Sequence, residues 1–263
     1  MSPRSPDKYD LDSHIAEIYD QEEDHIDDVE FLRRLLGQRS PLRILEPFCG
    51  TGRILIPLAQ DGHELIGFDR AQGMLDRAAM KIARLPEEVR RRITLHRADV
   101  LTVEWPGDCD LVILGANCLY EFGSAEDQEQ CIRSAAKSLR EGGFLFVDNN
   151  CRRGRVSKED LEWRGNFPTG TCADGTRIES HCAIVGIEPE KNLWMTQRSL
   201  RIISKSGEER GYETTGVTHP VSMEEVCYWL NKNGFVVLAL YGNRLGAPFT
   251  ADDRAIFWAQ MAR

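Results

Sequence analysis

The amino-acid sequence predicts a doubly wound α/β fold, in which a mainly parallel sheet of seven strands carries an inserted antiparallel β meander. Over residues 41–148, strand-like runs alternate with helical ones, an order that gives βαβ units and therefore parallel strands. Between residues 176 and 220, three long β-prone stretches are joined only by short turns, which is typical of antiparallel pairing. After residue 220 the chain returns to one helix and two further strands.

Length and composition indicate one enlarged domain. With 263 residues, 41% of them hydrophobic, the chain can bury one sizeable core and a small added layer. Its formal net charge of −9 would repel a phosphate backbone, so nucleic acid is not expected as a partner. No apolar stretch approaches the ~20 residues of a membrane helix, and the start MSPRSPDKYD lacks the apolar core of a signal peptide. We therefore expect a cytoplasmic protein without membrane contact.

Residues 1–40 are expected to form an N-terminal helical arm or lid. Residues 1–24 are polar and acidic with scattered apolar positions, which predicts a loosely held helix. The segment HIDDVEFLRRLLG is a firmer helix, because its apolar residues from Ile26 to Leu36 fall on one face. Gly37 suits the left-handed position after its last turn.

Residues 41–149 are expected to form the α/β core. The strands are LRILE, HELIGFD, ITLHRADV, DLVILGA and FLFVD. Helices are predicted at RILIPLAQDG, at AQGMLDRAAMKIARL and over residues 124–141, the last ended by Gly142 and Gly143.

Two further regions complete the predicted architecture. Residues 150–220 form the antiparallel insertion, which opens with a connection to about residue 171. Residues 221–263 return to the core sheet with one helix, which begins with the capping box of Ser222 and Glu225, and with the strands FVVLALYGN and RAIFWAQMAR.

The turn after the first strand is the best candidate for a ligand site, because open α/β sheets bind ligands beyond the carboxyl ends of their strands. It reads EPFCGTGR over residues 46–53. Gly50 and Gly52 allow a sharp bend and a close backbone approach, and the following helix offers free N–H groups. Asp69 ends the next strand, where a carboxylate can accept both hydroxyls of a ribose.

The spacing of these residues argues against a nicotinamide cofactor. A nicotinamide turn has the pattern Gly-x-Gly-x-x-Gly, but the third position, counted from Gly50, is Leu55. Instead, Glu46, Asp69 and Asp99 end the first, second and third strands in order.

This ordered set resembles the class I S-adenosylmethionine-dependent methyltransferases over about residues 42–148. EPFCGTG is similar to the first motif of the family, FDRAQGML to its second-strand motif, RADV to its third, and LREGGFLFVD to its helix-to-strand turn. Phe48 departs from the pattern, which often has glycine there. The resemblance implies a Rossmann-like methyltransferase fold, S-adenosyl-L-methionine as cofactor, and a small-molecule type loosely like glycine N-methyltransferase.

The resemblance also implies which residues bind the cofactor. Glu46 would lie near its methionine amino end, and Gly50 and Gly52 would contact it through the backbone. Asp69 and Arg70 would flank the ribose. Phe48, which is expected to crowd the turn because it stands where the family often has glycine, belongs to the same candidate site.

The remaining implied contacts lie further along the chain. Met74 would lie near the adenine, and Asp99 and Val100 would bind its edge. Asn117 or Leu119, after the fourth strand, would face the sulfonium and the acceptor.

The meander resembles the substrate-covering addition of small-molecule methyltransferases. Asn149 and Asn150 occupy a place where that group carries substrate-binding side chains. The Asp-His-Arg pattern of the group is Asp148-Asn149-Asn150 here, so an amino-acid acceptor is not implied. Arg152 and Arg153 are candidates to bind a carboxylate or phosphate, and a solvated loop is the alternative.

Several single residues are open to two interpretations. Tyr19 is either a lid over the cofactor or a packing contact, and Tyr120 and Glu121 either line the pocket or belong to an ordinary loop. His181 and His219 are the weak candidates for a general base.

Cysteines and aromatic residues are given structural roles. The eight cysteines are scattered without metal-ligand spacing, so we expect reduced, mostly buried thiols and no metal site. Cys49, inside the cofactor turn, is interpreted as a buried structural thiol. Trp194 and Met195 are more typical of a core than of a cage for a methylated ammonium.

The expected function is transfer of a methyl group to a nitrogen or oxygen of a small molecule. Methyl transfer from a sulfonium is an in-line displacement with a good leaving group, so alignment and desolvation suffice and a strong catalytic residue need not exist. The alternatives are a non-catalytic cofactor-binding module and a nicotinamide-dependent oxidoreductase on the same fold. The sequence leaves open the acceptor, its atom and the oligomeric state, a homodimer included.

Overall fold

A seven-stranded sheet forms the centre of the computed structural model, which describes residues 8–39, 41–250 and 254–262. The strand order is β11-β12-β5-β4-β1-β2-β3, and the sheet is parallel except for β12, which runs antiparallel to both β5 and β11. The strands are β1 (Arg43–Glu46), β2 (Glu64–Asp69), β3 (Ile93–Arg97), β4 (Cys109–Leu114), β5 (Leu139–Asn150), β11 (Phe235–Tyr241) and β12 (Arg254–Met261). The predicted fold class is confirmed.

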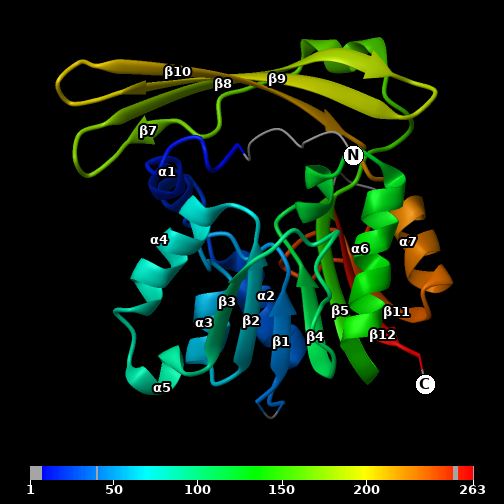
Figure 1. The fold of residues 1–263 in the computed structure, drawn as a ribbon. Helices are drawn as coiled ribbons and strands as arrows, with labels where there is room; N and C mark the ends of the chain where they lie inside the picture. Colours follow the sequence, from blue (N-terminus) through cyan, green and yellow to red (C-terminus); the bar gives the residue numbers. More distant parts are fainter. Residues whose placement is uncertain (1–7, 40, 251–253, 263) are drawn as a thin grey trace.

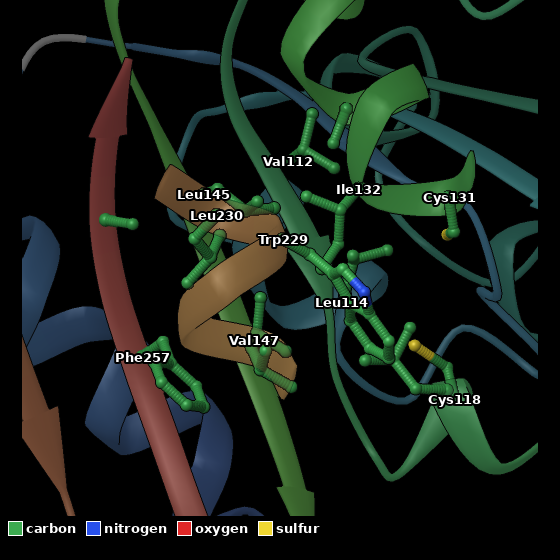
Figure 2. Close-up of a cluster of buried hydrophobic side chains, with 14 of the residues drawn as sticks. Val112, Leu114, Cys118, Cys131, Ile132, Leu145, Val147, Trp229, Leu230 and Phe257 are labelled. Atoms are coloured by element: carbon green, nitrogen blue, oxygen red, sulfur yellow. The ribbon is translucent and has the colours of Figure 1, made fainter. Parts of the chain in front are cut away.

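Helices cover both faces of this sheet. They are α2 (Asp27–Leu36), α3 (Leu55–Gln60), α4 (Gln72–Ile82), α5 (Glu87–Arg90), α6 (Ala125–Ser138) and α7 (Met223–Lys232). On one face, α2 and α3 bury their leucines against β1, β2 and β4. On the other face, α6 and α7 pack on β4, β5 and β12, with Ile132, Trp229 and Phe257 among the contacts (Figure 2).

The element boundaries differ from the predicted ones at two places. The helix expected over residues 124–141 ends at Ser138, and Gly142, with a φ of +72°, lies within β5. The helix expected from Arg53 begins at Leu55, because the glycine-rich turn extends further. Leu139 therefore belongs to a strand and not to the helix before it.

A second sheet lies across one end of the core sheet (Figure 1). Its order is β10-β9-β8-β6, all antiparallel, and β7 also pairs with β8. It comprises β6 (Arg164–Gly165), β7 (Gly170–Thr171), β8 (Arg177–Glu188), β9 (Leu193–Ile203) and β10 (Glu209–Thr218), preceded by the short helix η2 (Lys158–Glu162). The predicted meander is β8 to β10, whereas β6 and β7 lie in residues expected to form a connection.

The register of the second sheet decides which side chains face the core. Cys182, Arg198 and Thr214 lie directly opposite one another on β8, β9 and β10, so they share one face. Leu200 and Ile202 are on this face too, and they are buried against α1. We call it the inner face.

Helix α1 (Ile15–Glu22) lies between the two sheets (Figure 1). The expectation of a loosely held helix is wrong. Ile15 and Ile18 are almost fully buried among the apolar residues of the inner face, and Ala16 packs against α4 through Met74. The scattered apolar residues therefore anchor α1 both to the second sheet and to α4.

Two other expectations concern the whole chain. All eight cysteines are free, and all but Cys227 are buried, as predicted. None of the helices in the described ranges has both the length and the apolar character required to cross a membrane.

Candidate functional site

A cavity of about 390 Å³ lies between the carboxyl ends of the parallel strands and the inner face of the second sheet. The strand order reverses beside β1, which pairs with β2 on one side and β4 on the other. This is the switch point at which doubly wound sheets bind ligands. The volume is in the range of small-molecule and cofactor pockets.

The core side of the wall comes from the turns that follow four strands. The turn after β1 contributes Phe48 and Gly50, the turn after β2 contributes Asp69 and Arg70, and the turn after β3 contributes residues 98–100. The segment after β4 supplies the remaining residues of this wall, which are Gly115, Ala116, Cys118, Tyr120, Glu121, Phe122, Gly123 and Asp127.

Asp69 fixes the geometry of the glycine-rich turn. Its Oδ2 accepts a hydrogen bond of 2.9 Å from the Gly50 N–H, and its Oδ1 accepts one of 2.8 Å from the Ala71 N–H. Gly50 and Gly52 have φ angles of +51° and +79°, which side chains other than glycine rarely adopt. The same carboxylate therefore joins two strand ends and faces the cavity.

Phe48 points toward the segment after β4. Its ring lies 5.7 Å from that of Phe122 at 79°, an edge-to-face contact within the cavity wall. The departure from glycine at this position therefore links the turn after β1 to the segment after β4.

The glycine-rich turn also carries two buried polar atoms that lack hydrogen bonds. Oε2 of Glu46 and Nε of Arg53 have no partner among the described residues. Burial raises the pKa of Glu46 well above its ordinary value, although the positive charge of Arg53 acts in the opposite direction. A carboxyl oxygen and a guanidinium N–H without partners at one turn suit the ammonium and carboxylate of a methionine moiety.

Arg53 is held by the adjacent helix. Its two terminal nitrogens donate to Asp28 at 2.8 and 2.6 Å, and Asp28 is fully buried. Arg244 lies 3.7 Å from the same carboxylate and also donates to Asp27. His25, Asp27 and Asp28 have ligand atoms close enough for a metal ion, but these two guanidinium groups already occupy the cluster, which therefore remains structural.

The N-terminal segment closes one side of the cavity. Tyr9 and Tyr19 line it, with their rings 5.9 Å apart in an edge contact. Lys8 reaches Glu121 across the wall, with 2.7 Å between Nζ and Oε1. Burial raises the pKa of the Tyr19 phenol, so its hydroxyl stays protonated.

Asp20 fastens α1 to the cofactor turn. It accepts hydrogen bonds from Thr51, Arg77 and Lys81, which lie on the turn and on α4. Burial opposes ionisation of this carboxyl, but the hydrogen bonds from Arg77 and Lys81 outweigh it and lower its pKa. Helix α1 is thus attached by a charged cluster and not by apolar contacts alone.

Many of the predicted cofactor residues line the cavity, and others do not. Those in the wall are Tyr19, Phe48, Gly50, Asp69, Arg70, Asp99 and Val100. Glu46 and Gly52 lie behind the wall, within the same turn. Met74, only 2% exposed, packs under α1 with Ala71 and is not a wall residue.

The segment after β4 differs from its predicted role. Asn117 has a left-handed φ of +60°, and its side chain accepts a hydrogen bond from the Asn150 N–H instead of facing the cavity. Leu119 is fully buried in the core cluster. Tyr120 and Glu121 do line the cavity.

The predicted acceptor residues beyond β5 are not brought to the cavity. Asn149 is fully buried and Asn150 is exposed. Arg152 binds Asp160 with both terminal nitrogens and stacks over Trp194, so it organises η2, and Arg153 is exposed outside the wall. An anion site at these arginines is therefore not supported.

Neither histidine candidate faces the cavity. His181 is exposed on the outer face of β8. His219 is buried, and its Nε2 lies 2.9 Å from Glu225, which caps α7. A general base at either residue is not supported.

Sequence reasoning missed the second-sheet side of the wall. These residues are Cys182, Thr196, Arg198, Thr214, Thr215, Gly216, Val217 and Thr218. Side chains alternate between the two faces of each strand, so the sequence pattern alone does not say which face is turned toward the cavity. The contact with α1 identifies the inner face.

Comparisons with known proteins agree with this geometry. Residues 44–143 match the family model described as "Methyltransferase domain". A putative methyltransferase of Bacillus subtilis, YqeM, is 29% identical over 107 residues, which are 40% of this chain and 41% of that protein. The chain matches less than half the length of the curated relatives.

Solved structures match over nearly the whole chain. An S-adenosylmethionine-dependent methyltransferase from Clostridium acetobutylicum has a TM-score of 0.74 at 14% identity, covering 94% of this chain and 98% of that one. The sugar N-methyltransferase KedS8 from Streptoalloteichus has a TM-score of 0.70 at 16% identity, covering 100% and 99%. Residues 44–143 therefore match a methyltransferase domain, and the chain has the fold of the class I S-adenosylmethionine-dependent methyltransferases.

Proposed function

We propose that this chain transfers the methyl group of S-adenosylmethionine to a nitrogen or oxygen atom of a small-molecule acceptor. One observation carries the proposal: a single cavity joins the glycine-rich turn, Asp69 and Asp99 to the inner face of the second sheet. A cofactor at the strand ends and an acceptor under the second sheet would thus share one cavity. The solved structure of KedS8, a protein named as a sugar N-methyltransferase, has the same fold.

The proposed cofactor half uses the residues of the strand ends. Asp69 would accept from the ribose hydroxyls, and Asp99 and Val100 would lie along the adenine. Glu46 and Arg53 would hold the charged methionine end through the two buried atoms that lack partners. S-adenosylmethionine supplies a methyl group activated by its sulfonium.

The protein contributes alignment and exclusion of water. Tyr19 on α1 and the pair of Lys8 with Glu121 cover the cavity from the N-terminal side. An in-line displacement requires a fixed acceptor and a dry site more than a strong base. Asp127 lines the cavity with no hydrogen bond or ion pair to its carboxylate among the described residues, so it is the group placed to take a proton from an acceptor.

Cofactor binding is the first test. S-adenosylhomocysteine at 100 times its Kd should stabilise the fold by about 2.7 kcal/mol and raise the Tm by several degrees, whereas NAD and NADP should not. Gly50→Val should lose the shift, because its φ of +51° excludes a branched side chain and the backbone approach would be blocked. A shift with NAD alone would support the oxidoreductase alternative.

Turnover is the second test. The protein is incubated with S-adenosylmethionine labelled in the methyl group and a pool of small metabolites, and labelled products are identified by mass spectrometry. A labelled acceptor supports the enzyme. Cofactor binding without any labelled product would support the non-catalytic module.

A further inference from the structure

Arg198 on β9 is a cation of the cavity wall that has no counterion. It is half-buried, and its side chain donates to the carbonyl oxygen of Phe167. No carboxylate of the described residues lies within the 4.0 Å of an ion pair from its guanidinium. Its other N–H donors have no hydrogen-bond partner in the described part of the chain.

The lack of a counterion distinguishes Arg198 from the charged groups around the glycine-rich turn. The formal net charge is −9, and the arginines around the lid and the glycine-rich turn are paired, as Arg53 is with Asp28 and Arg77 with Asp20. Lys8, a second cation of the wall, is paired with Glu121. A partly buried charge without a partner lowers the stability of the fold. The position of Arg198 in a cavity wall therefore indicates that its partner arrives with a ligand.

The surroundings of Arg198 are built for an oxyanion. Thr214 lies directly opposite on β10, and Thr196 lies two residues along β9 on the same inner face. Both are wall residues, and each hydroxyl can donate one hydrogen bond. Gly216, opposite Thr196, leaves room for the Thr196 hydroxyl, since a Cβ there would come within 2.9 Å of its Oγ1.

We propose that Arg198, with Thr196 and Thr214, binds a carboxylate or phosphate group of the methyl acceptor. The proposal rests on the proposed function, because it assigns the second-sheet side of that cavity to the acceptor. A guanidinium can hold such a group with two parallel N–H bonds, and the hydroxyls complete its coordination. The proposed anion ligand is thus Arg198 of the inner face, and not Arg152 or Arg153, which lie outside the wall.

The test uses simple anions, because the acceptor itself is unidentified. Protein saturated with S-adenosylhomocysteine is titrated with acetate and with inorganic phosphate at constant ionic strength, and the Tm is followed. Arg198→Gln should weaken the response to the preferred anion about tenfold or more, and Arg198→Lys should retain part of it. Arg201→Gln is the matched control, since Arg201 is exposed on the outer face of the same strand and pairs with Glu209. The two anions distinguish a carboxylate from a phosphate acceptor.

Three outcomes separate this inference from the proposed function. Failure to bind S-adenosylhomocysteine contradicts the proposed function itself. Normal cofactor binding with no response to either anion, or with equal responses in wild type and Arg198→Gln, overturns the role of Arg198. In turnover assays, pairs of small amines that differ only in a carboxylate or phosphate group should show the anionic member reacting faster with wild type, and this preference should be lost in Arg198→Gln.

Discussion

Removal of the Asp69 carboxylate should weaken both the cofactor site and the turn that forms it. Asp69 lines the cavity while it accepts from the Gly50 and Ala71 N–H groups. Asp69→Ala leaves these two donors without their acceptor, and it removes the proposed contact to the ribose. The variant should therefore differ from wild type with and without ligand.

The two effects have different magnitudes. Two charge-assisted hydrogen bonds to ribose hydroxyls contribute about 1.5–3 kcal/mol each, and competition with water reduces the sum to roughly 2–4 kcal/mol. This corresponds to about 30- to 1,000-fold in Kd. Gly50 is half-buried, but Ala71 is fully buried, so its N–H would be left without an acceptor. The loss of stability without ligand should therefore be about 1–3 kcal/mol, or roughly 2–12 °C in Tm.

Calorimetric titration with S-adenosylhomocysteine, beside thermal unfolding of the ligand-free proteins, measures both quantities. Asp69→Asn tests the charge at nearly constant shape, because the amide keeps one acceptor oxygen. Asp76→Asn, on the exposed side of α4, is the control. Affinity within threefold of wild type in Asp69→Ala would refute the ribose contact, and an unfolded Asp69→Asn would show that the role of the residue is purely structural.

Three further predictions follow from the same geometry. Asp28→Ala should reduce the free energy of unfolding by about 3–5 kcal/mol, because it strands the buried Arg53; urea unfolding measures this, and a loss below 1 kcal/mol would contradict the buried pair. Burial disfavours the cationic form of His14, but its hydrogen bonds to Asp12 and Asp174 outweigh this effect and raise its pKa. The stability that His14 contributes is therefore complete below the unfolded pKa of about 6.5 and is lost as the pH rises through the folded pKa. In this pH range the Tm should fall less steeply in His14→Gln than in wild type, and parallel curves of Tm against pH would argue against this role. Gly67→Ala should cost about 1–3 kcal/mol, because its Cβ would lie 2.6 Å from Leu55 and 2.8 Å from Cys49; an unchanged Tm would show that the site relaxes freely.

The strand-end side of the cavity, which is the proposed cofactor half, could be predicted because it is local in sequence. Gly50, Asp69 and Asp99 each follow a strand directly, and parallel strands bring their carboxyl ends to one edge of the sheet. Met74 was misplaced for a related reason. Its position in the motif is local, but whether it faces the cavity or α1 depends on a helix more than 50 residues earlier in the chain.

The acceptor half could not be predicted, because it depends on contacts between distant segments. Arg152, and not Arg198, is predicted from the sequence as an anion ligand, yet Asp160 neutralises Arg152 and no described carboxylate pairs with Arg198. The inner face of the second sheet is chosen by the burial of Ile15 and Ile18 of α1 against it, and a strand pattern alone does not distinguish its two faces.

The sequence by itself determined the order of strands and helices, the parallel core, the inserted meander and the glycine-rich turn, because periodicity, turn residues and motif spacing act over a few residues. Only the tertiary structure decided that the N-terminal helix is anchored between the second sheet and α4, that the two proposed histidines do not line the cavity, and that Arg198 does. The physical reason is that burial and charge pairing are set by whichever residues meet in space, and α1 meets strands that lie more than 150 residues later in the chain.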